Sequence, residues 1–192
     1  DLIGNGKHHL IPTFQPLVDG GYQSARKKNS TVAPVKAVAG RVQPLGKAAA
    51  PVKGRFCVQR WGGLTLVDDT YNASVESVLA GIDALTAMSG YKVLVFGDMK
   101  ELGEESAEQH ARVGRHARER GLDAVLTVGE QSRHTADAAA GRHFDNKASL
   151  FEVLAQMINT HQEISILVKG ARGSRMEDIV KMVVDRQESA IC

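Results

Sequence analysis

The sequence lacks what several protein classes require. Only two of its 192 residues are cysteines, Cys57 and Cys192, too few for a disulfide framework or a four-ligand zinc site. The seven histidines show no ligand spacing with cysteines or paired carboxylates, so we expect no metal site. No hydrophobic run approaches the roughly 18 residues of a membrane span, which excludes an integral membrane protein. No secretory leader is recognisable at the start, and a cytoplasmic protein is expected.

Charge of both signs is present but unevenly distributed. Residues 1–64 hold ten Lys or Arg and two Asp or Glu, whereas residues 65–192 hold fourteen and twenty. A basic segment can bind nucleic acid. Here the basic residues are scattered among Pro, Gly and Ala, without interleaved aromatic residues or a nucleic-acid motif. We therefore expect no nucleic-acid partner.

Residues 1–50 have the character of an irregular arm or linker that is poorly ordered. All five prolines lie in the first 51 residues, and this stretch has no apolar periodicity. The segment Gly4-Asn5-Gly6-Lys7 has a slight likeness to a phosphate loop. Its glycine spacing is wrong, however, and His8 stands where Ser or Thr is needed. The folded domain is therefore expected over residues 51–192.

Short apolar runs alternate with helical patterns from about Phe56 onward. Strands are expected over residues 56–59, 64–67, 91–96, 124–128, 142–144 and 164–168, and helices over 74–88, 104–120, 131–140, 150–160 and 174–187. Ser74 is a candidate N-cap. Strands this apolar must be covered on both faces, which predicts an α/β fold with a Rossmann-like, mostly parallel sheet and helices on both faces. Such sheets bind ligands at the carboxyl ends of their strands.

Three polar segments follow expected strands. Residues 68–74 carry two carboxylates, a tyrosine and an asparagine, which suit a nucleotide but also a turn and a helix cap. Residues 97–103 carry Asp98 and Glu101, which could orient an amine or a metal-bound water, or stabilise the next helix. Residues 169–175 hold three cations and two glycines before a helix, a combination that favours an anion over a solvated surface loop.

Taken together, these segments resemble the C-terminal domain of the Mur ligases, and within them the MurF family. The motifs are residues 67–74, the Gly-Asp-Met-x-Glu-Leu-Gly loop at 97–103, Lys169-Gly170-Ala171-Arg172, and Met176-Glu177. The match runs from about residue 52 to about residue 186. It implies an ATP- and Mg²⁺-dependent ligase of peptidoglycan synthesis. Such a ligase activates the carboxylate of a UDP-N-acetylmuramoyl tripeptide as an acyl phosphate, which the amine of D-Ala-D-Ala then attacks.

The resemblance also implies roles for individual residues. Those matching the ATP site are Arg55, Asp69, Tyr71 and Asn72, and those matching the site of the dipeptide carboxylate or the phosphate are Lys169 and Arg172. Asp69 would contact the ribose, and Arg55 would reach the phosphates, with Arg41 as the second choice. Asp98 and Glu101 would lie in a loop near the site. Ser74 and Ala171 depart from the usual Asn and Ser of the family, and each loses one side-chain partner.

A phosphate loop of the form Gly-x-x-Gly-Lys-[Ser/Thr] is missing from the sequence. The resemblance places that loop, the magnesium ligands and a carbamylated lysine in a central ATPase domain. We therefore expect the chain to be a fragment that is inactive alone and works with its own central domain. Two alternatives stay open: a sister Mur or folylpolyglutamate-type ligase, against which the Gly-Asp-Met loop argues, and a non-catalytic flavodoxin-like binding module.

Overall fold

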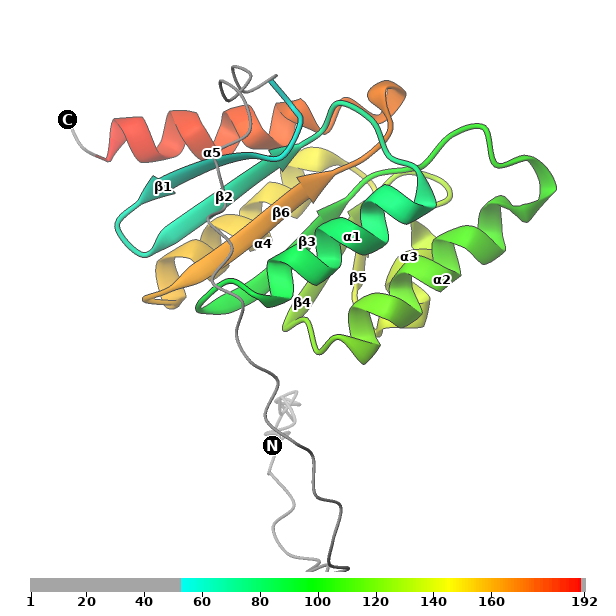
Figure 1. The fold of residues 1–192 in the computed structure, drawn as a ribbon. Coiled ribbons are helices and arrows are strands. Elements are labelled where there is room, and N and C mark those ends of the chain that lie inside the picture. Colours follow the sequence, from blue (N-terminus) through cyan, green and yellow to red (C-terminus); the bar gives the residue numbers. More distant parts are fainter. Residues whose placement is uncertain (1–52, 191–192) are drawn as a thin grey trace, which may run out of the picture. The chain divides into compact units, whose positions relative to one another are not determined.

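The structure is a computed structural model that describes residues 53–190 (Figure 1). The arm expected over residues 1–50, together with Arg41, lies outside the described residues. No helix within 53–190 combines the length and the apolar character that a membrane crossing needs.

Six strands, five α-helices and two 3₁₀ turns make up the domain. The strands are β1 (Cys57–Trp61), β2 (Leu64–Asp69), β3 (Tyr91–Phe96), β4 (Ala124–Val128), β5 (Arg142–Phe144) and β6 (Ile164–Lys169). The helices are α1 (Val75–Thr86), α2 (Ser106–Glu119), α3 (Arg133–Ala139), α4 (Lys147–Thr160) and α5 (Glu177–Ser189). The 3₁₀ turns are η1 (Gly103–Glu105) and η2 (Arg172–Ser174).

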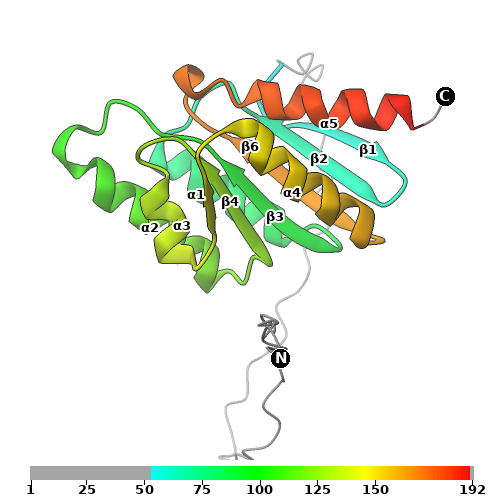
Figure 2. The ribbon, with the colours of Figure 1, turned by 180° about the vertical axis from the view of Figure 1, so that it is seen from behind.

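The strands form one sheet in the order β1-β2-β6-β3-β4-β5. β1 pairs with β2 in an antiparallel hairpin, and every other pairing is parallel. Figures 1 and 2, seen from opposite sides, show α1 and α2 on one face and α4 and α5 on the other, with α3 beside α2 near β5. The predicted α/β fold with a mostly parallel sheet covered on both faces is confirmed.

The core lies on both sides of the central strand β6, all of whose residues are buried. Ile166 and Val168 pack towards α4 and α5, and Leu167 packs towards α1 and α2. This alternation follows from the period of two along a strand. The register also sets Lys169 at the end of β6 beside Asp69 of β2 on one side and Phe96 of β3 on the other. Two residues 100 positions apart in the sequence thus become neighbours.

Side-chain caps mark the starts of two helices. Ser74 caps α1 as predicted, since its side chain accepts a hydrogen bond from the Ser77 amide and the Ser77 side chain accepts one from the Ser74 amide. Asn146 caps α4 by one hydrogen bond, which its side-chain oxygen accepts from the Ser149 amide at 2.9 Å, so that helix begins earlier than expected. The last helix begins later, at Glu177, because η2 and Arg175, which has a left-handed backbone (φ 48°), come before it.

Candidate functional site

The carboxyl ends of β2, β6 and β3 lie side by side at one edge of the sheet. Helix α2 follows β3 on one face of the sheet, and α5 follows β6 on the other face (Figures 1 and 2). The connections that leave these two neighbouring parallel strands therefore lead to opposite faces, which makes this place a topological switch point. The loops after β3 and β6 are joined there, because the amide of Ala171 donates to the carbonyl of Asp98 at 2.8 Å. Ligands of open α/β sheets bind at such a switch point. We call this edge, with its three loops 70–74, 97–103 and 170–176, the switch edge.

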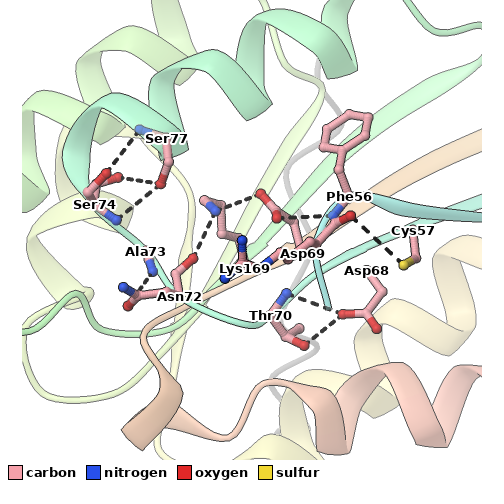
Figure 3. Close-up of polar contacts among 11 residues, drawn as sticks. Phe56, Cys57, Asp68, Asp69, Thr70, Asn72, Ala73, Ser74, Ser77 and Lys169 are labelled. Atoms are coloured by element: carbon pink, nitrogen blue, oxygen red, sulfur yellow. Dashed lines mark hydrogen bonds and ion pairs between the residues drawn. The ribbon is translucent and has the colours of Figure 1, made fainter. Parts of the chain in front are cut away.

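Asp69 and Lys169 form a buried ion pair at the switch edge (Figure 3). Lys169 Nζ lies 2.6 Å from Asp69 Oδ2 and donates to the carbonyl oxygen of Asn72 at 2.9 Å. Asp69 Oδ1 accepts from the amide of Phe56 at 3.1 Å. Lys169 is only 1% exposed, whereas the Asp69 side chain keeps 17% of its surface open. The ammonium therefore points at a neighbour within the protein, and the carboxylate is the partner that solvent can reach.

The other carboxylate of the acidic pair has a local role. Asp68 is buried, and its Oδ1 accepts hydrogen bonds from the amide of Thr70 at 3.2 Å and from its hydroxyl at 2.6 Å. Successive side chains of a strand point to opposite faces, so Asp68 and Asp69 diverge. The structure thus separates the pair into a turn-forming residue and one that faces Lys169.

Two guanidinium groups lie close to the ring of Tyr71. Arg55 Cζ lies 4.3 Å from the centroid of the Tyr71 ring, and Arg172 Cζ lies 5.6 Å from it. Both distances fall within the range of cation–π attraction. Tyr71 is 42% exposed, and it lines a pocket of about 280 Å³ whose other walls include Lys53 and Glu177. Residues from three separate segments are therefore brought together, and the pocket carries more positive than negative charge.

A second pocket, of about 440 Å³, lies between residues 72–74, 100–102 and 171–173. Its lining includes the cations Lys100 and Arg172 and the carboxylate of Glu101. Glu101 has a left-handed backbone (φ 64°), which is strained for a residue other than glycine and is met often at functional sites. The pocket therefore offers opposite charges at the switch edge to a small polar molecule. We call it the acceptor pocket.

Asp98 turns inward instead of facing a pocket. Its carboxylate accepts three backbone hydrogen bonds, from Glu130 at 3.1 Å, Gln131 at 3.0 Å and Ser132 at 2.8 Å. Gly129 permits this approach, since a Cβ there would lie 2.4 Å from Asp98 Oδ1, and its φ of 129° suits only glycine. Asp98 thus ties the loop after β3 to the loop after β4.

The three cations expected together near the last helix have different partners. Lys169 faces Asp69, Arg172 lies over Tyr71, and Arg175 lies 3.6 Å from Asp178. Lys147, which the sequence did not single out, binds Asp178 at 2.8 Å. The hydrogen bond from Lys147 is the main cause of a lowered pKa of Asp178, with burial opposing it. A joint anion site of all three cations is therefore not what the structure builds.

His110 is a buried residue in contact with the switch edge that sequence reasoning missed. It is fully buried on α2, and its ring contacts the backbone of the loop after β3. The two histidines of α2 show no ligand spacing in the sequence, so only its contacts reveal the role of His110. Among residues 53–190, no group of three His, Cys, Asp or Glu is placed to hold a metal ion.

In the comparison with known proteins, the two parts of the sequence match different family models. Residues 54–172 match the family described as Mur ligase, glutamate ligase domain. Residues 1–60 match a domain of unknown function, DUF3362. In addition, a UPF0313 protein of Pseudomonas aeruginosa is 76% identical over 33 residues. These residues are 17% of this chain and 4% of that protein.

Curated relatives that match over most of this chain are named as ligases. The UDP-N-acetylmuramoyl-tripeptide–D-alanyl-D-alanine ligase of Escherichia coli is 44% identical over 143 residues, which are 73% of this chain and 31% of that enzyme. The crystal structure of the MurF ligase of Thermotoga maritima in complex with ADP is similar with a TM-score of 0.63 and 32% identity, over 74% of this chain and 33% of that one. The chain spans about a third of the length of the curated relatives it matches. The resemblance to the MurF family is thereby confirmed, and the chain belongs to the Mur ligases, of which residues 54–172 form the glutamate ligase domain.

Proposed function

We propose that this chain supplies the nucleotide- and acceptor-facing domain of an ATP-dependent ligase that joins D-alanyl-D-alanine to a UDP-N-acetylmuramoyl tripeptide. The observation that carries the proposal is the convergence of Asp69, Tyr71 and Arg172 on one edge of a Mur ligase domain, beside the acceptor pocket. Such a ligase would act in the cytoplasm and serve peptidoglycan synthesis, and through it cell shape and division.

The switch edge fits a nucleotide. Each oxygen of Asp69 makes one contact within the protein, so each keeps acceptor capacity for a ribose hydroxyl. Asn72 Oδ1 accepts from the amide of Ala73 at 2.9 Å, which leaves its Nδ2 group as the donor for a base nitrogen. Arg55 lies over the ring of Tyr71 and would bind phosphate oxygens. The ligands of Mg²⁺ would come mainly from the central domain of the complete enzyme.

The acceptor pocket fits the two charged ends of a dipeptide. Arg172 would bind the dipeptide carboxylate, and Glu101 would orient its amine, with Lys100 adding positive charge to the same wall. Lys169 would contribute by holding Asp69 and the backbone of Asn72 in place. We thus divide the roles of Lys169 and Arg172, which the sequence treats alike.

The proposed reaction needs little covalent chemistry from this domain. The terminal carboxylate of the tripeptide attacks the γ-phosphorus of ATP and takes up its phosphoryl group, and ADP leaves. The dipeptide amine then attacks the acyl carbon of the acyl phosphate. The new C–N bond replaces the bond to the phosphate oxygen, phosphate leaves, and the amine gives up a proton. The domain positions the amine and excludes water, which would otherwise hydrolyse the acyl phosphate.

A domain graft tests the proposal. Residues 54–190 replace the matching segment of the Escherichia coli relative, and phosphate release is measured with D-Ala-D-Ala and with single amino acids. We expect phosphate release to depend on D-Ala-D-Ala. The KM for ATP should rise about tenfold or more in Asp69→Ala, and the KM for the dipeptide should rise by a similar factor in Arg172→Ala. Each variant loses a charged hydrogen bond to its ligand.

Arg142→Ala is the matched control, because it removes a guanidinium that lies over Phe144, outside the switch edge. Preference for a single amino acid would indicate a sister ligase instead. Unchanged KM values in both Asp69→Ala and Arg172→Ala would refute the site. The 192-residue chain alone should release no phosphate from ATP, and a release that Asp69→Ala abolishes would contradict the need for a central domain.

A further inference from the structure

The loop over residues 97–103 has a fixed half and an open half. In the fixed half, the carboxylate of Asp98 binds three amides, its carbonyl accepts from Ala171 and Ser174, and the side chain of Met99 is buried. In the open half, residues 100–102 line the acceptor pocket. The position of the open half therefore depends on what holds the fixed half.

His110 of α2 is one of these holds. The amide of Met99 donates to His110 Nε2 at 3.0 Å, and His110 Nδ1 lies 2.7 Å from the carbonyl oxygen of Ser106. On its other side, the hydroxyl of Thr135 donates to the carbonyl of His110 at 2.8 Å and ties α3 to the same turn of helix. One ring thus links the loop after β3 to α2, and α3 is attached at the same residue.

The two contacts define the protonation state of the ring. An amide N–H can only donate, so Nε2 must be the unprotonated acceptor for Met99. The carbonyl of Ser106 can only accept, so Nδ1 must carry the proton. His110 is therefore neutral in this arrangement, because a second proton on Nε2 would point at the N–H of Met99 and break that hydrogen bond.

We propose that His110 is a positioning residue whose neutral ring latches the fixed half of this loop to α2, and that protonation of the ring releases the loop beside the acceptor pocket. Only the identity of the ligand in that pocket rests on the function proposed above. The latch itself rests on the contacts of Met99, His110 and Ser106.

The charged surroundings of the ring are mixed. Asp98 in the loop favours the protonated ring, whereas Lys100 in the loop and His134 on α3 oppose it. The carbonyl of Ser106 on α2 favours protonation, and Phe96 on β3 adds a neutral aromatic ring at 6.1 Å. Burial is the largest influence, and it lowers the pKa of His110 from its usual 6.5. The latch should therefore stay closed at neutral pH and open on the acid side of that value.

Hydrogen exchange of the Met99 amide tests the latch in the complete 192-residue chain without any ligand. His110→Gln keeps an acceptor oxygen but does not titrate, and His110→Phe keeps ring volume without an acceptor. We expect protection of the wild-type Met99 amide to fall about tenfold between about pH 7.5 and about pH 5, in line with the loss of one hydrogen bond. Protection should not depend on pH in His110→Gln and should be low at both pH values in His110→Phe.

His116→Gln is the control, since His116 lies on the same helix but pairs with Asp83, away from the loop. Wild-type protection in His110→Phe would overturn the proposal. The proposal would also be overturned if protection of the wild-type Met99 amide stayed constant across pH while the ¹⁵N shifts of the ring showed that His110 titrates. If His110→Phe does not fold, the contrast between wild type and His110→Gln still decides. A positive result for the latch, together with no dependence on D-Ala-D-Ala in the domain graft, would count against the proposed function and leave the latch standing.

Discussion

Asp69 and Asp98 are two carboxylates at the same edge of one sheet, yet they have different surroundings. Asp69 is the last residue of β2 and Asp98 follows the end of β3, and these two strands flank β6. Asp69 pairs with the ammonium of Lys169 and stays partly open to solvent. Asp98 is buried and is satisfied by three neutral backbone amides. A buried carboxylate that is bound to several backbone amides shapes loops, whereas one that keeps more acceptor capacity and some exposed surface can bind a ligand. The comparison shows that the partner, more than the residue type, indicates the role.

The largest effect is expected from breaking the ion pair. Lys169→Met should lower the free energy of unfolding by about 3 kcal/mol, since removing one partner of a buried pair leaves the other uncompensated, and the partial exposure of Asp69 moderates the loss. Urea denaturation measures it. Lys181→Met, which removes an exposed lysine paired with Asp185, is the control and should change nothing measurable. Equal behaviour of the two variants would mean that the pair does not support the switch edge.

Removal of the Asp98 carboxylate should have the next largest effect. Asp98→Ala leaves three amides without their acceptor and should lower the free energy of unfolding by about 2 kcal/mol. The loss is no larger because two of these hydrogen bonds are only partly buried. Asp98→Asn keeps one acceptor oxygen and should cost about half as much. Denaturation curves of both variants give these values. Identical losses in Ala and Asn would show that hydrogen bonding to the amides is not the reason.

Ser132 sharpens the comparison, because its amide serves Asp98 while its buried hydroxyl oxygen has no hydrogen-bond partner among residues 53–190. Ser132→Ala should therefore raise the free energy of unfolding by about 0.5–1 kcal/mol, since an unsatisfied polar group is removed. Ser165→Ala is the matched control, because the hydroxyl of Ser165 donates to the carbonyl of Ser89 at 2.8 Å and its loss should destabilise. A loss of stability in Ser132→Ala equal to that in Ser165→Ala would contradict this.

The smallest effect is expected for the surface pair of Lys147 and Asp178, whose side chains are 26% and 41% exposed. The pKa of Asp178 is lowered, so its contribution is present above the usual value of 3.8 and is lost as pH falls through the lower folded value. With solvent screening, Asp178→Asn should cost about 0.5 kcal/mol near neutral pH and nothing at strongly acid pH.

Thermal unfolding across pH measures this difference, with Asp185→Asn as the control for an exposed acid on the same helix. If wild type and Asp178→Asn still differ in stability below the folded pKa of Asp178, ionisation of Asp178 is not the origin of that difference.

Periodicity and caps in the sequence were enough to predict most of the fold. The strand patterns predicted all six strands, although Arg142–Phe144 is not an apolar run, and Ser74 marked the start of α1 by a side-chain cap. The predicted start of the last helix, residue 174, was wrong, because nothing in the sequence indicates that Arg175 takes a left-handed backbone conformation. Among site residues, the sequence placed Asp69, Asn72 and Arg172 at strand ends. It could not show that Lys169 faces inward or that His110 holds a loop.

By itself, the sequence determined which segments are strands and helices and which chemical groups follow the strands, because both depend on neighbours within a few positions. The tertiary structure alone decided which groups meet. Inserting β6 between β2 and β3 brings Lys169 to Asp69 and joins the loop of Asp98 to that of Ala171. Contacts between residues so far apart in the chain depend on strand order and register, which follow from packing both faces of the whole sheet and not from any local pattern.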